Sequence, residues 1–271
     1  DAPAPVPGGN AVQDIVNVLT NDLYDGAPAL PDRVVLAPVT AGPLSLQADG
    51  TVDVAAGTPR GTYTLVYTLC DALTPGHCDS ATVTVVVLAT TLAVADDAAQ
   101  TPQGEPLVVA VLANDTFAGA VPDPARVNVQ VSRAPSNGTV VVQPGGRLRY
   151  TPAQYYSGQD SFQYMVCEIA TPENCATATV IVTVLPNTVM ALDDQVRTRT
   201  RTTVIAVLDN DTVSHAPLNP ASLSVVRAPA HGEATCAQGT CTYVAATGFS
   251  GQDRFGYRVC DVSVPNAVCA E

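Results

Sequence analysis

The chain has 271 residues and a formal net charge of −13, because 25 aspartates and glutamates outnumber 12 cationic residues. A protein of that charge repels a phosphate backbone, so we expect no nucleic-acid partner. All 12 cationic residues are arginine, and the lack of lysine excludes the Lys–Asn isopeptide cross-links that some surface proteins carry. The longest uncharged stretch, residues 81–95, is too short to span a bilayer and is interrupted by threonines, so we expect no membrane insertion in this segment.

One pentapeptide occurs three times along the chain, as VLTND at 18–22, VLAND at 111–115 and VLDND at 207–211. An Ala-Pro turn and a strand that ends in cysteine follow it in every copy, at similar spacings. Similarity at a fixed period means that one structural unit has been copied, which predicts three homologous domains of about 95 residues. We assign these domains to residues 1–88, 89–186 and 187–271.

The second repeat is complete and predicts the strands of the unit. Short runs that are rich in valine or alternate in polarity are separated by Gly, Pro and Asn turns, and helical periodicity is absent, so the fold class is all-β. Seven strands in this length predict a Greek-key β-sandwich of immunoglobulin type, and short linkers predict three tandem sandwiches arranged as an elongated rod. The predicted strands lie near 94–101 and over 106–112, 125–132, 139–143, 147–151, 160–167 and 176–184.

The eight cysteines fall into four local pairs whose spacing recurs from repeat to repeat. Structural zinc is the alternative to disulfides, but the spacings do not resemble zinc knuckles and no paired histidines accompany them. Disulfides are therefore predicted, and with them an oxidising compartment outside the cytoplasm. The predicted bridges are Cys70–Cys78, Cys167–Cys175, Cys236–Cys241 and Cys260–Cys269.

Acidic and amide side chains gather at the two predicted domain junctions. In a Greek-key sandwich the Asp pair that opens a repeat and the Asn-Asp that ends its pentapeptide lie at the same pole. Clustered hard oxygens suit Ca²⁺, which would stiffen the junctions. The alternative interpretation is that Asn-Asp ends a strand through side-chain-to-backbone hydrogen bonds while the Asp pair protects a sheet edge. The candidate calcium ligands are Asp96, Asp97, Asn114, Asp115, Asp193, Asp194, Asn210 and Asp211.

Catalysis is not expected from this sequence. The three histidines, His77, His215 and His231, all lie in predicted loops. The segment GFSGQ at 248–252 lacks the G-x-S-x-G spacing of a nucleophile elbow and is the third copy of a strand-to-strand corner.

The second and third repeats share an Asp-Asp opening, the VLAND strand end, an AP-x-x-G turn and the strand G-x-D-x-F-x-Y. In these motifs they resemble the tandem bacterial Ig-like (cadherin-like) repeats of large surface adhesins and fibrillar proteins. The first repeat departs from the pattern, with Pro3 and Ala4 in place of the Asp pair and Tyr63 in place of Asp160 and Asp253. The resemblance implies an extracellular location on a bacterial cell surface and a structural or adhesive role.

The leading hypothesis is a non-enzymatic structural segment of a bacterial adhesin, stalk or fibre, whose partners are neighbouring Ig-like repeats. The second hypothesis is a module that binds a carbohydrate or protein receptor on a surface, although the lack of tryptophan weakens the case for sugar binding. A third is an accessory region of a secreted enzyme, whose catalytic domain would lie outside these residues.

The third repeat stops two residues after Cys269, where the second repeat continues with ATATVIVTV. We therefore expect its last strand to be missing from this chain. Further residues of a longer protein would supply that strand, or identical subunits would supply it by donor-strand addition in a self-assembling fibre. The tail DAPAPVPGGN at 1–10 is a poor donor, because its prolines cannot donate hydrogen bonds to a neighbouring strand.

Overall fold

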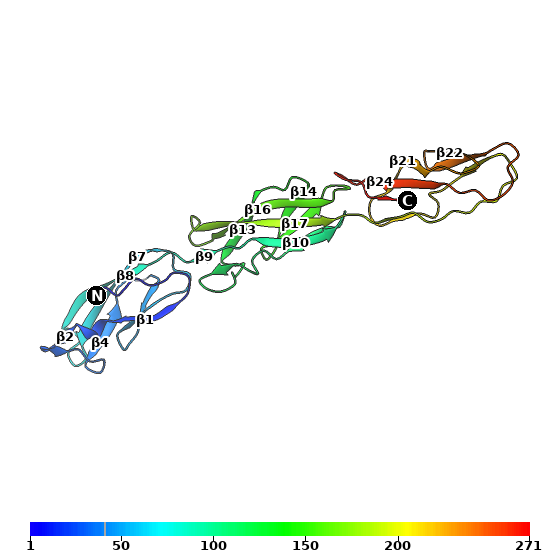
Figure 1. The fold of residues 1–271 in the computed structure, drawn as a ribbon. Helices are drawn as coiled ribbons and strands as arrows, with labels where there is room; N and C mark the ends of the chain where they lie inside the picture. The colour runs from blue at the N-terminus through cyan, green and yellow to red at the C-terminus, as the bar shows by residue number, and fades with distance from the viewer. Residues whose placement is uncertain (41) are drawn as a thin grey trace. The chain divides into compact units, whose positions relative to one another are not determined.

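The computed structural model describes residues 1–40 and 42–271 (Figure 1). These residues form β-strands, turns and one short 3-10 helix, η1 (Val18–Thr20), which confirms the predicted all-β, immunoglobulin-like class. The chain divides into two compact units, which are described separately below. The first unit consists of Asp1–Ala95, Val111–Gln130 and Met165–Ala178, and the second of Asp96–Ala110, Val131–Tyr164 and Thr179–Glu271.

In the first unit, residues 1–88 contain two three-stranded sheets, in the orders β1-β6-β5 and β4-β7-β8. A short hairpin of β2 and β3 follows η1, and the N-terminal segment forms a parallel bridge from Val6 to Val87. The strands are β1 (Val12–Asn17), β2 (Leu23–Tyr24), β3 (Ala27–Pro28), β4 (Val34–Pro38), β5 (Leu44–Leu46), β6 (Thr51–Val54), β7 (Gly61–Asp71) and β8 (Cys78–Val87).

Alternate side chains of both sheets form the core of residues 1–88. Val52 in β6, Tyr67 in β7 and Val83 in β8 are each fully buried in one hydrophobic cluster. Burying one such side chain stabilises the fold by about 1.5–3 kcal/mol before conformational entropy is subtracted. This alternation of buried and exposed positions is the pattern of a β-sandwich.

Residues 89–186 contribute strands to both units. In the first unit β9 pairs with β12, and in the second β11, β15 and β14 form a three-stranded sheet. A four-stranded sheet has the order β10-β17-β16-β13, with β10 parallel to β17. The strands are β9 (Leu92–Ala93), β10 (Asp97–Pro102), β11 (Leu107–Val109), β12 (Thr116–Phe117), β13 (Val127–Arg133), β14 (Gly138–Gln143), β15 (Arg147–Pro152), β16 (Gly158–Glu168) and β17 (Cys175–Leu185).

The predicted strands of this repeat are confirmed to within a few residues, with one exception. The apolar run 106–112 predicts a strand that continues to Leu112, but β11 ends at Val109. Val111 and Leu112 lie in a turn, where both side chains are still buried. The apolar run is therefore longer than the strand, because the side chains of the turn that follows it are also part of the core.

In the second unit, residues 187–271 contain the sheets β19-β23-β22 and β21-β24-β25 and the pair β18-β20. Their core is smaller than that of residues 1–88 and is built on Val207, Leu223, Cys241 and Val259. The strands are β18 (Val189–Met190), β19 (Thr202–Ile205), β20 (Thr212–Val213), β21 (Leu218–Arg227), β22 (Gly232–Ala237), β23 (Thr240–Ala245), β24 (Gly256–Asp261) and β25 (Cys269–Ala270).

All four predicted disulfides are present, and the described residues contain no free cysteine. Three of them join residues that lie directly opposite each other in an antiparallel pair, as Cys70 and Cys78 do in β7 and β8. The Cα–Cα distances of 3.9 to 4.1 Å fit this cross-strand geometry. Each bridge therefore closes a hairpin rather than joining two sheets.

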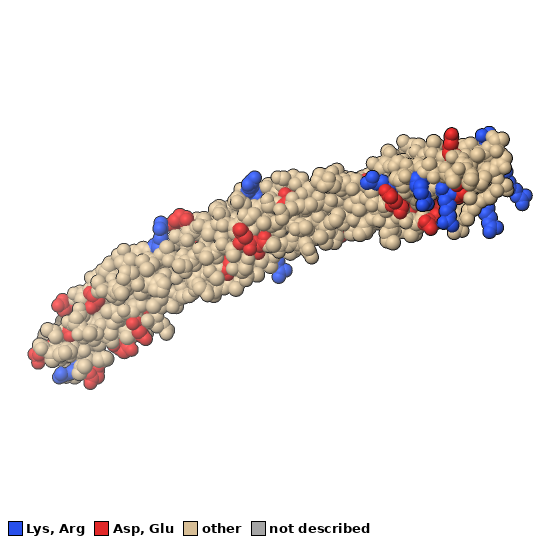
Figure 2. Space-filling view, viewed as in Figure 1, with Lys and Arg blue, Asp and Glu red and all other residues tan. Residues whose placement is uncertain are grey.

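Charge is distributed unevenly along the sequence. Residues 1–88 contain nine aspartates and two arginines, whereas residues 187–271 contain six of the 12 arginines. Figure 2 shows these arginine side chains gathered over the C-terminal part of the chain.

The glycine of the AP-x-x-G turn is required by close packing. A Cβ on Gly138 would lie 2.5 Å from the Tyr150 ring and 2.6 Å from the backbone oxygen of Thr151. Gly232 in the third repeat has the same surroundings, with the Val244 oxygen at 2.5 Å. These oxygens belong to strands paired with β14 and β22, so they cannot move without disturbing the sheet.

We therefore expect Gly138→Ala to lower the free energy of unfolding by about 1–3 kcal/mol, the usual cost of overpacking. Differential scanning calorimetry would measure the effect. Gly76→Ala is a matched control, because nothing lies within 4 Å of a Cβ at Gly76. Equal melting temperatures for the two variants would contradict this account of the repeated glycine.

Candidate functional sites at the linker segments

The Asn-Asp at the end of the third pentapeptide holds the segment that leads into its own repeat. Asp211 Oδ1 accepts hydrogen bonds from the Leu192 amide at 2.8 Å and from the Tyr257 hydroxyl at 3.0 Å. Asn210 Nδ2 donates to the backbone oxygens of Leu192 at 3.4 Å and Asp193 at 3.2 Å. The motif thus joins the turn after β19 to the segment at Leu192 and Asp193 that opens the same repeat.

The same arrangement occurs in the other repeats. Asp115 Oδ1 accepts a hydrogen bond from the Ala95 amide at 2.9 Å. In the first repeat, Asp22 accepts one from the Tyr67 hydroxyl at 2.7 Å. Burial raises the pKa of Tyr67, and the carboxylate of Asp22 raises it further. These contacts explain why the pentapeptide recurs, since each copy anchors the turn that follows a strand.

The predicted calcium ligands make mostly structural contacts. Asp96 Oδ1 accepts a hydrogen bond from the Thr179 amide at 2.7 Å. Burial raises the pKa of Asp194, and the neighbouring charge of Asp211 adds to this shift. Asp194 Oδ2 is buried without a hydrogen-bond partner, as a cation ligand would be. However, no group of three or more His, Cys, Asp or Glu side chains in the described chain is arranged to hold a metal ion. Calcium binding stays a prediction.

A second recurring aspartate caps the AP-x-x-G turn. Asp160 is buried and accepts hydrogen bonds from the amides of Ser136 at 3.0 Å and Asn137 at 2.9 Å. The Tyr150 hydroxyl donates to the same carboxylate at 2.9 Å. One side chain therefore satisfies two amides that leave the sheet at the turn.

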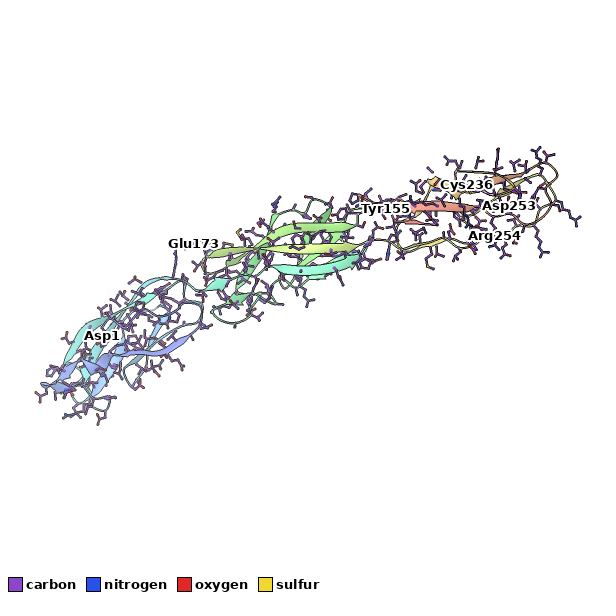
Figure 3. All side chains as sticks on the ribbon, viewed as in Figure 1. Asp1, Tyr155, Glu173, Cys236, Asp253 and Arg254 are labelled. Atoms are coloured by element: carbon purple, nitrogen blue, oxygen red, sulfur yellow. A yellow bond between two sulfur atoms is a disulfide. The ribbon has the colours of Figure 1, made fainter. Side chains whose placement is uncertain are left out.

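Asp253 does the same in the third repeat, beside Arg254 (Figure 3). It accepts hydrogen bonds from the amides of Ala230 at 2.9 Å and His231 at 2.8 Å. Burial alone would raise the pKa of Asp253, but the amide hydrogen bonds from His231 and Ala230 outweigh it and hold the pKa below its usual value. The carboxylate is therefore stabilised in its charged form.

The first repeat, which lacks this aspartate, builds the corner differently. The Tyr63 hydroxyl donates to the backbone oxygen of Pro59 at 2.8 Å. The Val66 amide donates to Thr40 Oγ1 at 3.0 Å. The two sheets of residues 1–88 form nonetheless, as the sequence predicts.

A buried glutamate anchors the linker between the first two repeats. Glu168, which follows Cys167, is 2 % exposed. Thr90 Oγ1 donates to it at 3.0 Å, and Asn174 Nδ2 donates to it at 2.8 Å. Asn174 also donates to the Thr90 backbone oxygen at 2.9 Å, so linker, carboxylate and disulfide-closed loop form one network.

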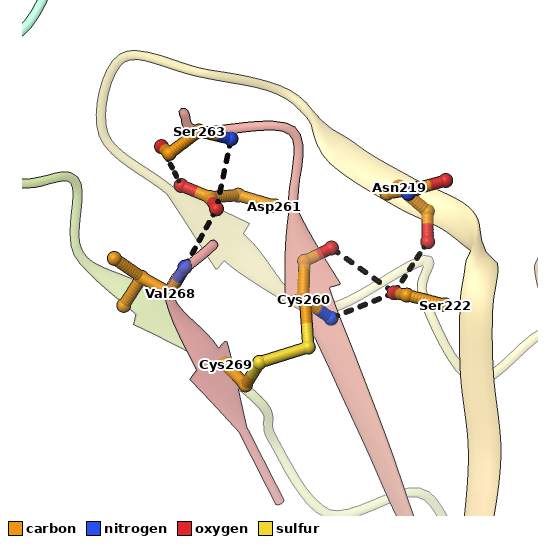
Figure 4. The surroundings of a disulfide bond; sticks show 7 residues. All are labelled: Asn219, Ser222, Cys260, Asp261, Ser263, Val268 and Cys269. Atoms are coloured by element: carbon orange, nitrogen blue, oxygen red, sulfur yellow. Dashed lines mark hydrogen bonds between the residues drawn. A yellow bond between two sulfur atoms is a disulfide. The ribbon is translucent and has the colours of Figure 1, made fainter. Parts of the chain in front are cut away.

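Asp261 has the equivalent position after Cys260 (Figure 4). It accepts hydrogen bonds from Asn187 Nδ2 and from the Val268 amide, both at 2.8 Å, and from the Ser263 hydroxyl. Burial would raise the pKa of Asp261, but the hydrogen bonds from Ser263, Asn187 and Val268 outweigh it, so the pKa is lowered. Asn187 is itself 3 % exposed, so the second linker, like the first, contains a buried residue.

In the second unit, backbone hydrogen bonds join residues 89–186 to residues 187–271. The Val264 amide donates to the Tyr155 oxygen and the Ser157 amide donates to the Val264 oxygen, both at 2.8 Å. Gln103, which is 1 % exposed, donates to the same Tyr155 oxygen at 2.7 Å and to Ser263 Oγ at 3.0 Å. A short parallel bridge and a buried amide thus connect the two segments.

In the first unit, the guanidinium group of Arg126 connects two segments. It lies over the Phe117 ring, 4.7 Å from the centroid, and donates a hydrogen bond to the Gly9 oxygen. A Cβ on Gly9 would lie 2.7 Å from Thr90 Cγ2, so the contact leaves no room for a side chain.

Sequence reasoning missed these linker networks. One signal was present, because an acidic residue follows the strand-end cysteine in all three repeats, as Asp71, Glu168 and Asp261. Gln103 and Gly9 gave no signal, since neither belongs to a motif shared by the repeats.

Comparison with known families decides the identity of the fold. Residues 89–183 and 186–264 each match the family described as Bacterial Ig domain, and together they make up more than half of the chain. The chain belongs to the bacterial Ig domain family. A bacterial Ig domain is a structural or adhesion-type module, and its fold is in general non-enzymatic. With four disulfides, this family membership indicates an extracellular protein.

Individual relatives are more distant from this bacterial Ig chain. It is 29% identical over 178 residues to Protein GAMETE EXPRESSED 2 of Arabidopsis thaliana. The matched region covers 64% of this chain but only 19% of that protein. The solved structure of human CDH23 EC21-23 is 13% identical, with 99% of this chain and 98% of that one covered and a TM-score of 0.34. The endo-fucoidan hydrolase MfFcnA4 from glycoside hydrolase family 107 is 10% identical, with coverages of 99% and 42% and a TM-score of 0.30. Scores this low carry no information on function.

Among residues 1–40 and 42–271, no helix has the length and hydropathy needed to cross a membrane.

The pKa of Asp253 leads to a pH prediction. Because its folded pKa lies below that of an ordinary aspartate, its contribution to stability is present above about pH 4 and is lost as the pH falls through the folded pKa. Asp253→Asn should therefore lower the melting temperature at neutral pH and reduce its dependence on pH in the acid range. Calorimetry from neutral pH downward would test this, with the exposed Asp209→Asn as control. An unchanged pH dependence in Asp253→Asn would show that the cap contributes nothing.

Calcium binding can be tested by comparing melting temperatures with calcium and with EDTA. If the junction acids bind Ca²⁺, calcium raises the melting temperature of the native chain, and Asp194→Asn removes most of that increase. If they do not, the native chain melts at the same temperature in both buffers, and the calcium prediction is wrong. In that case Asp194→Asn should stabilise the chain, because it removes a charge that is disfavoured by burial and by repulsion from Asp211.

Proposed function

We propose that the chain is a non-enzymatic structural segment of a bacterial surface adhesin, stalk or fibre. In this proposal residues 1–88, 89–186 and 187–271 are three tandem Ig-like domains that act as a semi-rigid spacer. The observation that carries the proposal is that each linker contains one buried residue, Thr90 or Asn187, that is hydrogen-bonded to a buried carboxylate.

Linker burial distinguishes a stiff connection from a flexible one. Flexible linkers are solvated and rich in glycine and serine, whereas Thr90 and Asn187 are 5 % and 3 % exposed. Both side chains donate to a buried carboxylate. Displacing either linker would expose a charged group that is satisfied only while the linker residue is in place, so each network favours one conformation of its linker.

The shifted pKa values also support a structural role. Asp253 and Asp261 have lowered pKa values because they accept hydrogen bonds from backbone amides and neutral side chains. A catalytic base needs a pKa close to neutrality and access to a substrate. These two carboxylates are instead stabilised as anions and occupied by the chain itself.

Small-angle scattering and negative-stain microscopy would test the spacer proposal. We expect a narrow distribution of angles between adjacent domains in the native chain. Asp261→Ala should broaden the distribution of angles between the domains joined at residues 186–188, because Asn187 and Ser263 lose their common acceptor. Glu233→Ala, at an exposed position in β22, should leave the angle unchanged.

A broad distribution of angles in the native chain would overturn the spacer proposal. Binding of the native chain on a glycan array would support the receptor-binding alternative, since a spacer should bind no glycan.

A further inference from the structure

In the first unit, an arginine of the second repeat contacts the backbone of the first repeat. Phe117 and Arg126 form a stacked pair, and Arg126 donates to the Gly9 oxygen of the preceding repeat. The Ile169 amide donates to the Arg126 backbone oxygen at 2.9 Å, so the disulfide-closed loop supports this arginine. Phe117 is 4 % exposed, because the contact covers it.

Residues 1–88 carry the same pair in an exposed form. Arg33 lies over the Tyr24 ring, 5.4 Å from the centroid. The Ala72 amide donates to the Arg33 oxygen at 3.1 Å, as Ile169 does to Arg126. Arg33 is exposed, and beside it Leu23 and Leu73 are 67% and 90% exposed. We call Leu23, Tyr24, Arg33 and Leu73 the N-terminal pole; it carries the counterpart of the Phe117–Arg126 pair, with its arginine exposed.

The N-terminal pole is surrounded by aspartates. Asp25 and Asp32 are exposed next to it, and Asp71 lies close enough to raise the pKa of Tyr24, although burial of the ring raises that pKa more. A partner for this surface therefore needs exposed cations.

Exposed cations lie on residues 187–271. Arg197 and Arg199 alternate with threonines and are exposed, as are the corresponding Gln100 and Pro102 of β10 in the second repeat. Residues 197–200 precede β19 (Thr202–Ile205) and are all exposed, so both arginines lie at the surface.

Contacts place more cations at the same pole. Arg201 Nε donates to the Ala245 oxygen at 3.0 Å, and the next residue, Ala246, donates to the His231 oxygen at 2.9 Å. His231 in turn donates to Asp253, which precedes the exposed Arg254. We call Arg197, Arg199, Arg201 and Arg254 the C-terminal pole; within residues 1–40 and 42–271 none of them forms a salt bridge.

We propose that the C-terminal pole of one copy of this chain binds the N-terminal pole of a second copy. The guanidinium groups of the C-terminal pole can form bidentate hydrogen bonds with the carboxylates around the N-terminal pole. Leu23 and Leu73 of the N-terminal pole supply apolar area that a second copy would cover, whereas an anionic polymer bound to the arginines would leave it exposed. The inference goes beyond the spacer function, which needs no second copy. Because exposed ion pairs are individually weak, the association is weak and decreases with salt.

Sedimentation velocity of the 271-residue chain at increasing concentration, in low and high salt, tests the proposal. We expect concentration-dependent oligomers in low salt and at least a ~10-fold weaker association in high salt. The double variant Arg197→Glu/Arg199→Glu should abolish association. Arg147→Glu/Arg149→Glu is the matched control, because it changes the same charge at two exposed positions of β15 and should retain association. Unchanged calorimetric transitions would confirm that all variants fold.

A charge swap makes the test specific. Asp25→Arg/Asp32→Arg should fail to associate alone but should pair with Arg197→Glu/Arg199→Glu when the two variants are mixed. A native chain that stays monomeric, an equal loss in the control variant, or no pairing in the mixture would each overturn the proposal. If the monomeric native chain instead binds a sulfated polysaccharide through Arg197 and Arg199, the C-terminal pole is a polymer site and the proposal is wrong. None of these outcomes changes the angle distribution that tests the spacer function.

Discussion

Backbone amides that leave a β-sheet at a turn need a new acceptor, and in this chain short carboxylates provide it. Asp211 accepts from the amide of Leu192, Asp253 from those of Ala230 and His231, and Asp261 from that of Val268. The side chain of aspartate is short enough to reach a nearby amide without leaving the turn. The sandwiches have many short strands, so they have many such ends, and this accounts for an acidic composition dominated by aspartate.

The sequence predicted those parts of the structure that depend on contacts within one repeat. The pentapeptide, the AP-x-x-G turn and the cysteine pairs recur because each copy makes the same internal contacts, as Asp160 and Asp253 do. Predicting strand ends was harder, because Val111 and Leu112 are buried in a turn rather than in a strand. The linker contacts of Gln103 and Gly9 could not be predicted, since each residue meets a partner from a different repeat and has no counterpart at the repeat spacing.

Membership of the bacterial Ig domain family describes the unit, while the linker networks describe how units are joined. Glu168 and Asp261 follow a cysteine of a disulfide-closed loop, and each accepts a hydrogen bond from the linker residue next to its repeat. A carboxylate held in this way is satisfied only when linker and loop are both in place. Folding of a repeat and ordering of the linker before it are thus coupled through a single side chain.

The short span of the disulfides determines how the chain would respond to a pulling force. The bridged cysteines are only 5 to 9 residues apart in sequence. Loops of that size withhold only about 16–32 Å of extension each, whereas a repeat of about 95 residues can extend to roughly 310–340 Å. Mechanical unfolding of a repeat would therefore release nearly its whole contour length with every bridge intact. The disulfides protect loop tips from fraying and proteolysis, and resistance to force depends on the hydrogen bonds between strands.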